Sequence, residues 1–499
     1  MTWNIWRGGE QVAFDKVVEV IRGSNADIVA IQEAEGNLER LARETGYTYY
    51  SRRLQLLSRF PLVDPQEVTR GERLVSGEGE FSKPYAWVEI ARGHVVLVSN
   101  LHLPSDADGP EALRDGIVGD KDVHDSEQQI RGSRVDTFCQ TIETVIKAYD
   151  VQAFVLGDFN SPHHRDCPDQ VCRVHWPATF IMEQHGFTDA YREKFPNVKT
   201  HPGLTWTTGY PAPFIKPAEQ LNRIDFVWYR TTSKRPVKPV NCFLIGESGV
   251  HMHQGRHINA GVEQSVTPWP SDHRAVVVDF QIEKPAPVPF PMVGTIGRRI
   301  QASDDFRVFV LQSALDKTSD LELALVNERS RKIVQSVGIR DGTDRKIMIF
   351  SSKIGDASER SASCAAVVCR RHPEQGHLIP FLTPGNHQIM DVVDASSPPS
   401  VTIHVHDSHL QVDWNHTPGD KWDWIGMFDA TETNAECAYK YAYLDGATHG
   451  SAQWDVTELC IDVNKQHLVW EVRLFSDDSN RWLASSCKFK LASVHSSVH

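Results

Sequence analysis

Short apolar runs recur through the first 280 residues and alternate with stretches of helical periodicity. Three of the runs are continuous enough to be strands buried on both faces, and they span residues 27–31, 95–98 and 153–156. Residues 12–21 have near-helical spacing and end before Gly23, and Ser126 opens a second amphipathic stretch that reaches Ile146. Strands that alternate with helices predict a layered α/β domain.

The composition changes abruptly at residues 283–291, where four prolines describe a stiff, extended linker. Beyond it, frequent Gly, Asp and Asn turns and little helical periodicity predict short strands packed as β-sandwiches. A second break, rich in serine and proline, follows residue 395. We therefore predict a catalytic domain, a linker and two sandwich modules, at residues 1–282, 283–291, 292–395 and 396–493.

The net charge of the chain is −13, which argues against a broad basic surface for gripping nucleic acid. It does not exclude a nuclease, because a bound divalent cation supplies positive charge at the phosphate itself. No apolar run is long enough for a transmembrane helix, and nine scattered cysteines do not make a disulfide scaffold. We expect a soluble, cytoplasmic protein, although a leader upstream of the short first strand stays open.

Six polar motifs end or follow apolar runs that read as strands. They are Thr2-Trp3-Asn4-Ile5-Trp6, Ile31-Gln32-Glu33, Ser99-Asn100-Leu101-His102-Leu103, Gly157-Asp158-Phe159-Asn160, Arg223-Ile224-Asp225-Phe226 and Ser271-Asp272-His273-Arg274. Any one alone would be interpreted as a turn, a cap or a surface segment. Together they indicate one active site that breaks phosphate esters.

Hydrolysis of a phosphodiester needs a metal to neutralise the phosphate oxygens, a positioned water and stabilisation of the leaving oxygen. Carboxylate and amide oxygens are the ligands that Mg²⁺ or Mn²⁺ prefers. Glu33 directly follows a buried strand, where a carboxylate is unfavourable unless it meets a cation or a donor. Asp158 and Asn160 lie two residues apart, so their side chains point to one side while Phe159 turns into the core.

Asp272 and His273 are adjacent before a strand, so their side chains point to opposite faces and do not pair easily. A different partner must orient His273, and Asp225 is the candidate. Such a dyad fixes the imidazole tautomer and raises its basicity. The alternative is a capping aspartate beside a surface histidine.

These motifs, with the secondary segment Leu57-Ser58-Arg59-Phe60-Pro61, resemble the endonuclease/exonuclease/phosphatase superfamily, the deoxyribonuclease I-like fold, over residues 1–282. The resemblance implies a four-layer α/β sandwich, in which two mixed sheets pack face to face with helices outside. It also implies an active site at one edge, on loops that leave the sheets.

Residue by residue, the resemblance implies a metal centre for Mg²⁺ or Mn²⁺. Glu33 and Asp272 would ligate the metal, and Asn4 would bind at or near it. Trp6 departs from repair-type nucleases, some of which carry an extra acidic ligand there. Lys83 departs from deoxyribonuclease I-type members, which place a glutamate near that position to pair with the residue matching His102.

The resemblance also implies a phosphate site. His102 would contact the scissile phosphate, and Asn160 would hold the phosphate or the leaving oxygen. Asp158 would align or activate the attacking water, while Asp225 would orient His273 against the phosphate. The general base, Asp158 or His273, stays open at this point.

Two features bear on the substrate. Trp206 and Trp228 would suit stacking on a base or a lipid face, although aromatic residues next to strands more often belong to the core. The acidic stretch of residues 106–125 would repel a long polyanion, which favours a small or membrane-surface phosphoester over duplex DNA.

A loop after Asn160 is rich in zinc-ligand residues: His163, His164, Cys167, Cys172 and His175. The spacing between its two cysteines is wider than that of a zinc knuckle, and no second cysteine pair follows. We therefore favour a polar insertion that rims the cleft over a structural zinc site.

The last predicted module carries aromatic motifs at Trp414, Trp422–Phe428 and Tyr439–Tyr443. They resemble immunoglobulin-like modules appended to phosphatases, including the SKICH type, over residues 399–493. The Trp and Tyr side chains would form the sandwich core. Contact with a protein partner or a membrane surface is a hypothesis for this module.

The sequence therefore predicts a Mg²⁺- or Mn²⁺-dependent phosphodiesterase, nuclease-like in mechanism, in which water attacks a metal-bound phosphate. Its partner would be a phosphoester in a nucleic acid, a lipid or a small molecule. The alternative is a catalytically silent relative that binds partners through its β-sandwich modules. Every expected catalytic position holds a chemically competent residue, which favours the enzyme.

Overall fold

The computed structural model describes most of the first 295 residues and the principal strands beyond them. The described residues are 1–65, 84–105, 109–114, 119–166, 174–206, 222–247, 251–253, 256–258, 262–295, 299–301, 306–311, 321–327, 333–339, 348–350, 363–371, 378–380, 387–393, 398–406, 409–415, 423–432, 438–444, 449–457, 468–475 and 482–491.

Two mixed, seven-stranded sheets form the centre of the predicted catalytic domain. The first has the order β14 (Val262–Ser265), β11 (Val237–Gly246), β15 (Ala275–Ile282), β1 (Thr2–Asn4), β2 (Ile28–Gln32), β4 (Leu56–Ser58) and β3 (Tyr49–Ser51). The second has the order β5 (Leu62–Val63), β6 (Ala86–Ala91), β7 (His94–His102), β8 (Ala153–Asp158), β10 (Asp225–Arg230) and β9 (Thr188–Asp189), with β16 (Ala286–Pro287) paired to β7. The three predicted buried strands are thus β2, β7 and β8.

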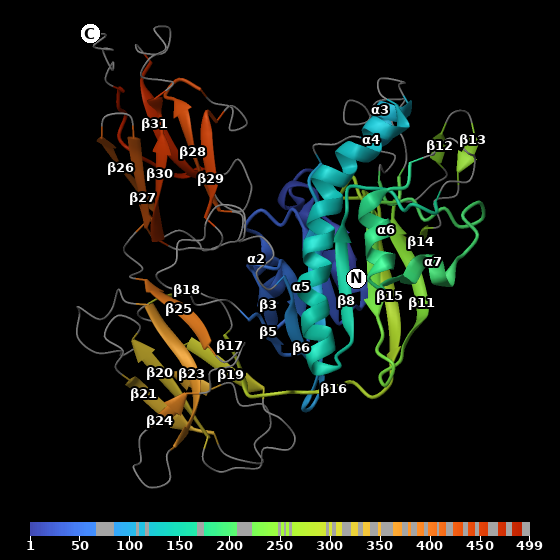
Figure 1. Cartoon of the computed structure of the whole chain (residues 1–499), viewed down its shortest axis with the longest axis horizontal. Helices are drawn as coiled ribbons and strands as arrows, with labels where there is room; N and C mark the ends of the chain where they lie inside the picture. The colour runs from blue at the N-terminus through green and yellow to red at the C-terminus, as the bar shows by residue number, and fades with distance from the viewer. Residues whose placement is uncertain are drawn as a thin grey trace.

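Helices accompany these sheets in the described residues. They are α1 (Phe14–Ser24), α2 (Leu38–Thr45), α3 (Gly109–Arg114), α4 (Asp120–Glu127), α5 (Ser133–Tyr149), α6 (Pro177–Gln184) and α7 (Ala190–Lys194), with the short turns η1 (Arg7–Gly9) and η3 (Gln128–Gly132). The apolar faces of α1 and α2 pack with β1 and β2 in one buried cluster. Those of α5 and α6 pack with β7, β8 and β10 in a second, which also fills the space between the sheets (Figure 1). None of the helices in the described residues is long and apolar enough to cross a membrane.

Two predicted helix ends were wrong. Gly23 lies inside α1, which ends at Ser24, and the left-handed residue that terminates it is Asn25, with φ +50°. Ser126 is no N-cap, because α4 already begins at Asp120 and continues through the π-helical turn η3 into α5. Acidic residues in the first turn of α4 favour that earlier start through the helix dipole.

The proline-rich segment 283–291 packs on the catalytic domain, and Ala286–Pro287 within it form the strand β16. Ala286 pairs with Val95 of β7, and the Val288 amide donates to the Gly93 carbonyl over 2.9 Å. Phe290 lies against Tyr149, with ring centroids 5.6 Å apart. The segment therefore acts as a short edge strand rather than as a free spacer.

Outside the two catalytic sheets, the described residues form four small all-β sheets and the hairpin β12 (His251–His253) with β13 (Arg256–Ile258). Two sheets follow the linker. The first has the order β17 (Met292–Thr295), β19 (Phe306–Leu311) and β22 (Met348–Phe350). The second has the order β18 (Arg299–Gln301), β25 (His387–Val393), β23 (Ser363–Arg371), β20 (Leu321–Asn327) and β21 (Ile333–Gly338), with β24 (Leu378–Pro380) paired to β23. Two further sheets come after these in the sequence. One has the order β26 (Ser400–His406), β27 (His409–Asn415) and β30 (His449–Asp455). The other has the order β29 (Lys440–Tyr443), β28 (Trp424–Asp429), β31 (Trp470–Phe475) and β32 (Trp482–Ser485).

The last two sheets share one core, as a β-sandwich requires, because residues of β26 and β27 pack with residues of β28 and β31. Trp414 lies in that core, as predicted. Tyr441 and Tyr443 do not, since they are 63% and 39% exposed, and their prediction as core residues was wrong. Alternation along β29 turns both tyrosines away from the core.

Candidate active site

The candidate site forms where strand ends of the two sheets meet. In the second sheet, His102 of β7 and Asp225 of β10 are both in register with Asp158 of the central strand β8. In the first sheet, Asn4 at the end of β1 is in register with Gln32, the residue before Glu33. Strand pairing thus gathers five of the six motifs at one edge.

A hydrogen-bonded bridge joins the two sheets at this edge. The Asn4 side-chain amide donates to Glu33 Oε1 over 2.9 Å and to Asp158 Oδ2 over 3.2 Å. The Asn4 Oδ1 atom accepts from the Trp6 backbone N–H over 3.0 Å. Asn4 therefore holds the two carboxylates at a fixed separation, and its own oxygen is engaged by the backbone.

Asp158 is the hub of the cluster and is almost fully buried. Its Oδ1 accepts from the Asn160 backbone N–H over 2.8 Å. Its Oδ2 lies 3.7 Å from His102 Nε2 and 3.7 Å from His273 Nε2. One carboxylate oxygen is thus shared among two imidazoles and an amide.

His273 forms the predicted contact with Asp225: the His273 Nδ1 atom lies 3.0 Å from Asp225 Oδ2. The indole N–H groups of Trp3 and Trp269 donate to the His273 carbonyl over 3.0 and 2.9 Å and fix the backbone. Burial lowers the pKa of His273, but the charges of Asp225 and Asp158 outweigh it and raise that pKa to about 10. Since both ring nitrogens face carboxylates, the surroundings favour the imidazolium.

Asp272 is an incompletely compensated acid of the site. Its Oδ1 atom is buried and, like Asp225 Oδ1, has no hydrogen-bond partner among the described residues. Burial, together with the nearby charges of Glu33 and Asp158, raises the pKa of Asp272 to about 6. An orphaned carboxylate oxygen among other carboxylates fits a hard divalent cation, and Glu33 and Asp272 supply the oxygen donors that Mg²⁺ or Mn²⁺ prefers.

The backbone around the site is strained. Nine non-glycine residues among those described have positive φ, and five of them lie in the loops that carry the site: Trp6, Arg7, Glu33, Glu35 and Asn160. Left-handed backbone is unfavourable for such residues and persists where surrounding contacts impose it. At Glu33, with φ +58°, the Arg7 amide donates to the carboxylate over 2.8 Å and holds it at the rim.

Comparison with known proteins identifies the family of the chain. The sequence model of the endonuclease/exonuclease/phosphatase family matches residues 1–273. The chain belongs to that family. An uncharacterized protein of Caenorhabditis elegans is 30% identical over 303 residues, which cover 56% of this chain and 90% of the relative. A solved endonuclease/exonuclease/phosphatase from Beutenbergia cavernae is 13% identical with a TM-score of 0.33, over 98% of both chains.

Membership of the endonuclease/exonuclease/phosphatase family indicates a phosphoester hydrolase. Asp158, Asp225 and His273 also qualify as a candidate metal cluster, because their ligand atoms lie within 4.8 Å of one another. The 3.0 Å hydrogen bond between His273 and Asp225 already accounts for much of that proximity. Asp272, which is close enough to Glu33 for the two charges to interact, offers a second candidate place for a cation.

The remaining predicted site residues lie at the rim of the site. The Asn160 side-chain amide donates to the Leu103 carbonyl over 2.8 Å and ties the loop after β8 to the loop after β7. Trp206 is half-buried, and its ring centroid lies 6.4 Å from that of His273. Trp228 is fully buried in the core, which rules out the stacking role suggested for it. The departure at Lys83 falls outside the described residues.

Sequence reasoning assigned no role to several supporting side chains. Gln32 donates to Asn100 Oδ1 over 2.7 Å, and Asn100 in turn donates to the Ile31 carbonyl over 2.7 Å, a second link between the sheets. The Thr205 hydroxyl accepts from the Asp225 amide over 3.2 Å and fixes the start of β10. A polar side chain inside a run of buried strand residues was the available signal for Gln32 and Asn100.

Proposed function

We propose that this chain is a divalent-cation-dependent phosphodiesterase whose active site is the edge cluster around Asp158. The supporting observation is that a buried His273–Asp225 pair faces Asp158 across 3.7 Å, next to the unpartnered Asp272 carboxylate. Burying several carboxylates together costs free energy unless a ligand binds them, so a catalytically silent relative would not be expected to have this cluster.

Glu33 and Asp272 would hold the cation, and Asn4 would position Glu33. When bound, a divalent cation would neutralise charge on the phosphate oxygens and lower the pKa of a bound water.

Asp158 is the group we assign as general base, since it accepts hydrogen bonds and can take the proton of the attacking water. His273 carries protons on both ring nitrogens, because both face carboxylates, and it donates from Nε2 to a phosphate oxygen. His102, which also faces Asp158, contacts the phosphate from the other side. Asn160 holds the leaving oxygen or the phosphate, and Trp206 lines the approach to His273.

Hydrolysis of bis-p-nitrophenyl phosphate tests the assignment. The purified chain should release p-nitrophenol with Mg²⁺ or Mn²⁺ and stop when EDTA is added. Asp158→Ala and His273→Ala should each abolish turnover, whereas Asp122→Ala, at an exposed acid on α4, should leave it unchanged. Turnover at the wild-type rate in either site variant would refute the proposal.

A panel of DNA, RNA, sphingomyelin, phosphoinositides and small phosphodiesters would then assign the substrate class. The net charge of −13 supports a small or membrane-surface phosphoester over a long polyanion. A preference for duplex DNA at physiological salt would contradict that choice without contradicting the chemistry.

We further propose that residues 292–395 and 396–493 are separate β-sandwich modules, the second immunoglobulin-like, and that they contact a protein partner or a membrane surface. The shared core of the last two sheets supports the sandwich assignment for the second module. Deletion of residues 396–493 should leave hydrolysis of the small diester intact while reducing activity on a membrane-bound substrate.

A further inference from the structure

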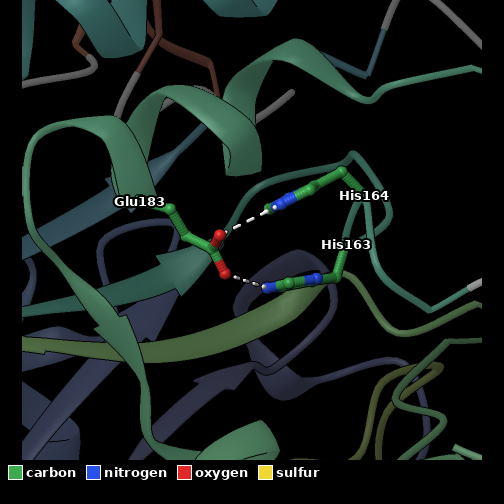
Figure 2. Close-up of side chains that lie close together, drawn as sticks. All are labelled: His163, His164 and Glu183. Carbon is green, nitrogen blue, oxygen red and sulfur yellow. Dashed lines mark ion pairs between the residues drawn. The ribbon is translucent and has the colours of Figure 1, made fainter.

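His163, His164 and Glu183 form a polar cluster in the same domain that the proposed mechanism does not use. The two histidines belong to the loop after Asn160, and Glu183 lies in the last turn of α6. Figure 2 shows both imidazole rings pointing at the Glu183 carboxylate. His163 Nε2 lies 3.6 Å from Glu183 Oε1, and His164 Nε2 lies 3.1 Å from Glu183 Oε2.

The separations suit a metal ion. Ligand atoms bound to tetrahedral Zn²⁺ at about 2.0–2.1 Å lie roughly 3.3 Å from one another. One nitrogen from each ring and a carboxylate oxygen are close enough to share such an ion, since all lie within 4.8 Å. Two histidines and a glutamate are also a donor set that zinc accepts.

His163 supplies the strongest sign of a missing partner. Its side chain is 1% exposed, and within the described part of the chain its Nε2 atom has no hydrogen-bond partner, although it points at the carboxylate. The ring is fixed by stacking on Trp228 and on His164, with centroids 5.5 and 4.6 Å away. Asp189, whose Oδ2 lies 3.6 Å from the same nitrogen, is already paired with Arg223 over 2.7 Å.

His164 has the support that metal-binding histidines usually have. Its Nδ1 lies 3.3 Å from the Thr179 hydroxyl, which can accept the ring proton and leave the Nε2 lone pair free.

Arg165 is the group that a metal would displace. Its guanidinium pairs with Glu183 and donates to His164 Nε2 over 3.4 Å, but its side chain is 66% exposed, so this ion pair is weak. The Arg165 backbone N–H donates to His163 Nδ1 over 3.0 Å. Coordination through Nε2 places the ring proton on Nδ1, so this amide contact must open when the metal binds.

We propose that His163, His164 and Glu183 bind a Zn²⁺ ion that fastens the loop after Asn160 to helix α6. The ligand set differs from the cysteine-containing one considered from the sequence, because its acidic member comes from α6 and not from the loop. The site is independent of the hydrolase proposal.

Zinc content tests the site without any measurement of activity. The full-length chain is stripped with EDTA, dialysed with excess Mg²⁺ to fill the oxygen-ligand site, reloaded with ZnCl₂, and dialysed again before elemental analysis. The expected result is one retained zinc per chain and a higher melting temperature than that of the stripped protein. Wild-type protein that retains no zinc after reloading and dialysis, so that zinc bound as an adventitious ion only, would overturn the proposal.

Variants locate the ion. Glu183→Gln and His164→Ala should lose the retained zinc, and Thr179→Ala should weaken zinc affinity about 10–100-fold by releasing His164. His185→Ala removes a histidine next to the same helix, where it pairs with Asp136, and should keep the zinc. Glu33→Gln, at the proposed catalytic metal site, should also keep the zinc.

A ligand variant could misfold, so its circular dichroism spectrum without metal must match that of the wild type. Hydrogen exchange at the Arg165 backbone amide of the wild type, measured with and without zinc, tests the site without any variant. Zinc retained by a folded Glu183→Gln variant, or an Arg165 amide that zinc does not affect, would contradict the site.

Discussion

Nδ1 of His273 lies 3.0 Å from Oδ2 of Asp225 in a pair that is shielded from solvent. The contact joins Asp225, at the start of β10 in one sheet, to His273, two residues before β15 in the other. The imidazole orientation therefore depends on how the two sheets pack.

Asp225→Asn keeps the shape of the pair and removes its charge. The amide cannot stabilise the imidazolium, so kcat should fall about 100- to 10,000-fold while the fold is retained. Steady-state hydrolysis of bis-p-nitrophenyl phosphate measures the effect. Asp279→Asn, at an exposed acid on β15, is the matched control and should behave as the wild type. An Asp225→Asn variant with full kcat would mean that the pair is only structural.

Asp272→Asn should make the metal-free protein more stable and should abolish its stabilisation by Mn²⁺. Burial raises the pKa of Asp272 to about 6, above its ordinary value of 3.8, so at neutral pH the ionised group destabilises the metal-free fold. The variant should be roughly 1–3 kcal/mol more stable in EDTA at pH 7, and this gain should disappear below pH 4, where both states are protonated. Thermal unfolding in EDTA and in Mn²⁺ measures both effects. The variant should also lose the stabilisation that Mn²⁺ gives the wild type, and an unchanged response to Mn²⁺ would remove Asp272 from the metal site.

Glu143 provides a pH dependence away from both candidate metal sites. Hydrogen bonds from Lys147 and Arg230 lower the pKa of Glu143 to about 2. A lowered carboxyl pKa stabilises the fold above the unfolded value of 4.5, and that contribution is lost as the pH falls from 4.5 towards 2. The group is partly exposed, so Glu143→Gln should lose under about 1 kcal/mol at pH 7 and nothing near pH 2. Urea unfolding of both proteins across this range is the measurement, and a difference that persists at pH 2 would refute the assignment.

Gly157 permits the close approach of β8 to β7. Its φ is +150°, and a Cβ atom there would lie 1.9 Å from the Leu101 carbonyl oxygen. Gly157→Ala should therefore destabilise the chain by more than about 3 kcal/mol or displace Asp158 and abolish activity. Gly23→Ala is the control: no atom lies within 4 Å of its added Cβ in α1, and it should stabilise by about 0.5–1 kcal/mol. Melting temperatures of the two variants test the contrast, and equal values would contradict the packing argument.

Much of the candidate site follows from local sequence pattern. A polar residue at the end of a buried strand must lie at a sheet edge, and the sequence alone predicts this place for Glu33 and Asp158, while Asp225 begins β10 at the same edge. The argument that Asp272 and His273 point to opposite faces also led to Asp225 as the histidine partner, and the hydrogen bond is present. The roles of these residues stay predictions until the variants are measured.

The helix ends illustrate where local pattern was insufficient. Ser126 and Gly23 have the chemistry of cap residues, yet both lie inside helices. Packing of the helices on the sheets overrides such local preferences, which are worth about 1 kcal/mol each.

The chemical groups at the strand ends follow from the sequence alone, because side-chain alternation and strand length are local properties. The contacts among those groups depend on the tertiary structure. The bridge from Asn4 to Asp158 crosses two sheets, and the pairing of His163 with Glu183 joins a loop to a helix. Such distances depend on the packing of buried side chains far apart in the chain, and no local spacing encodes them.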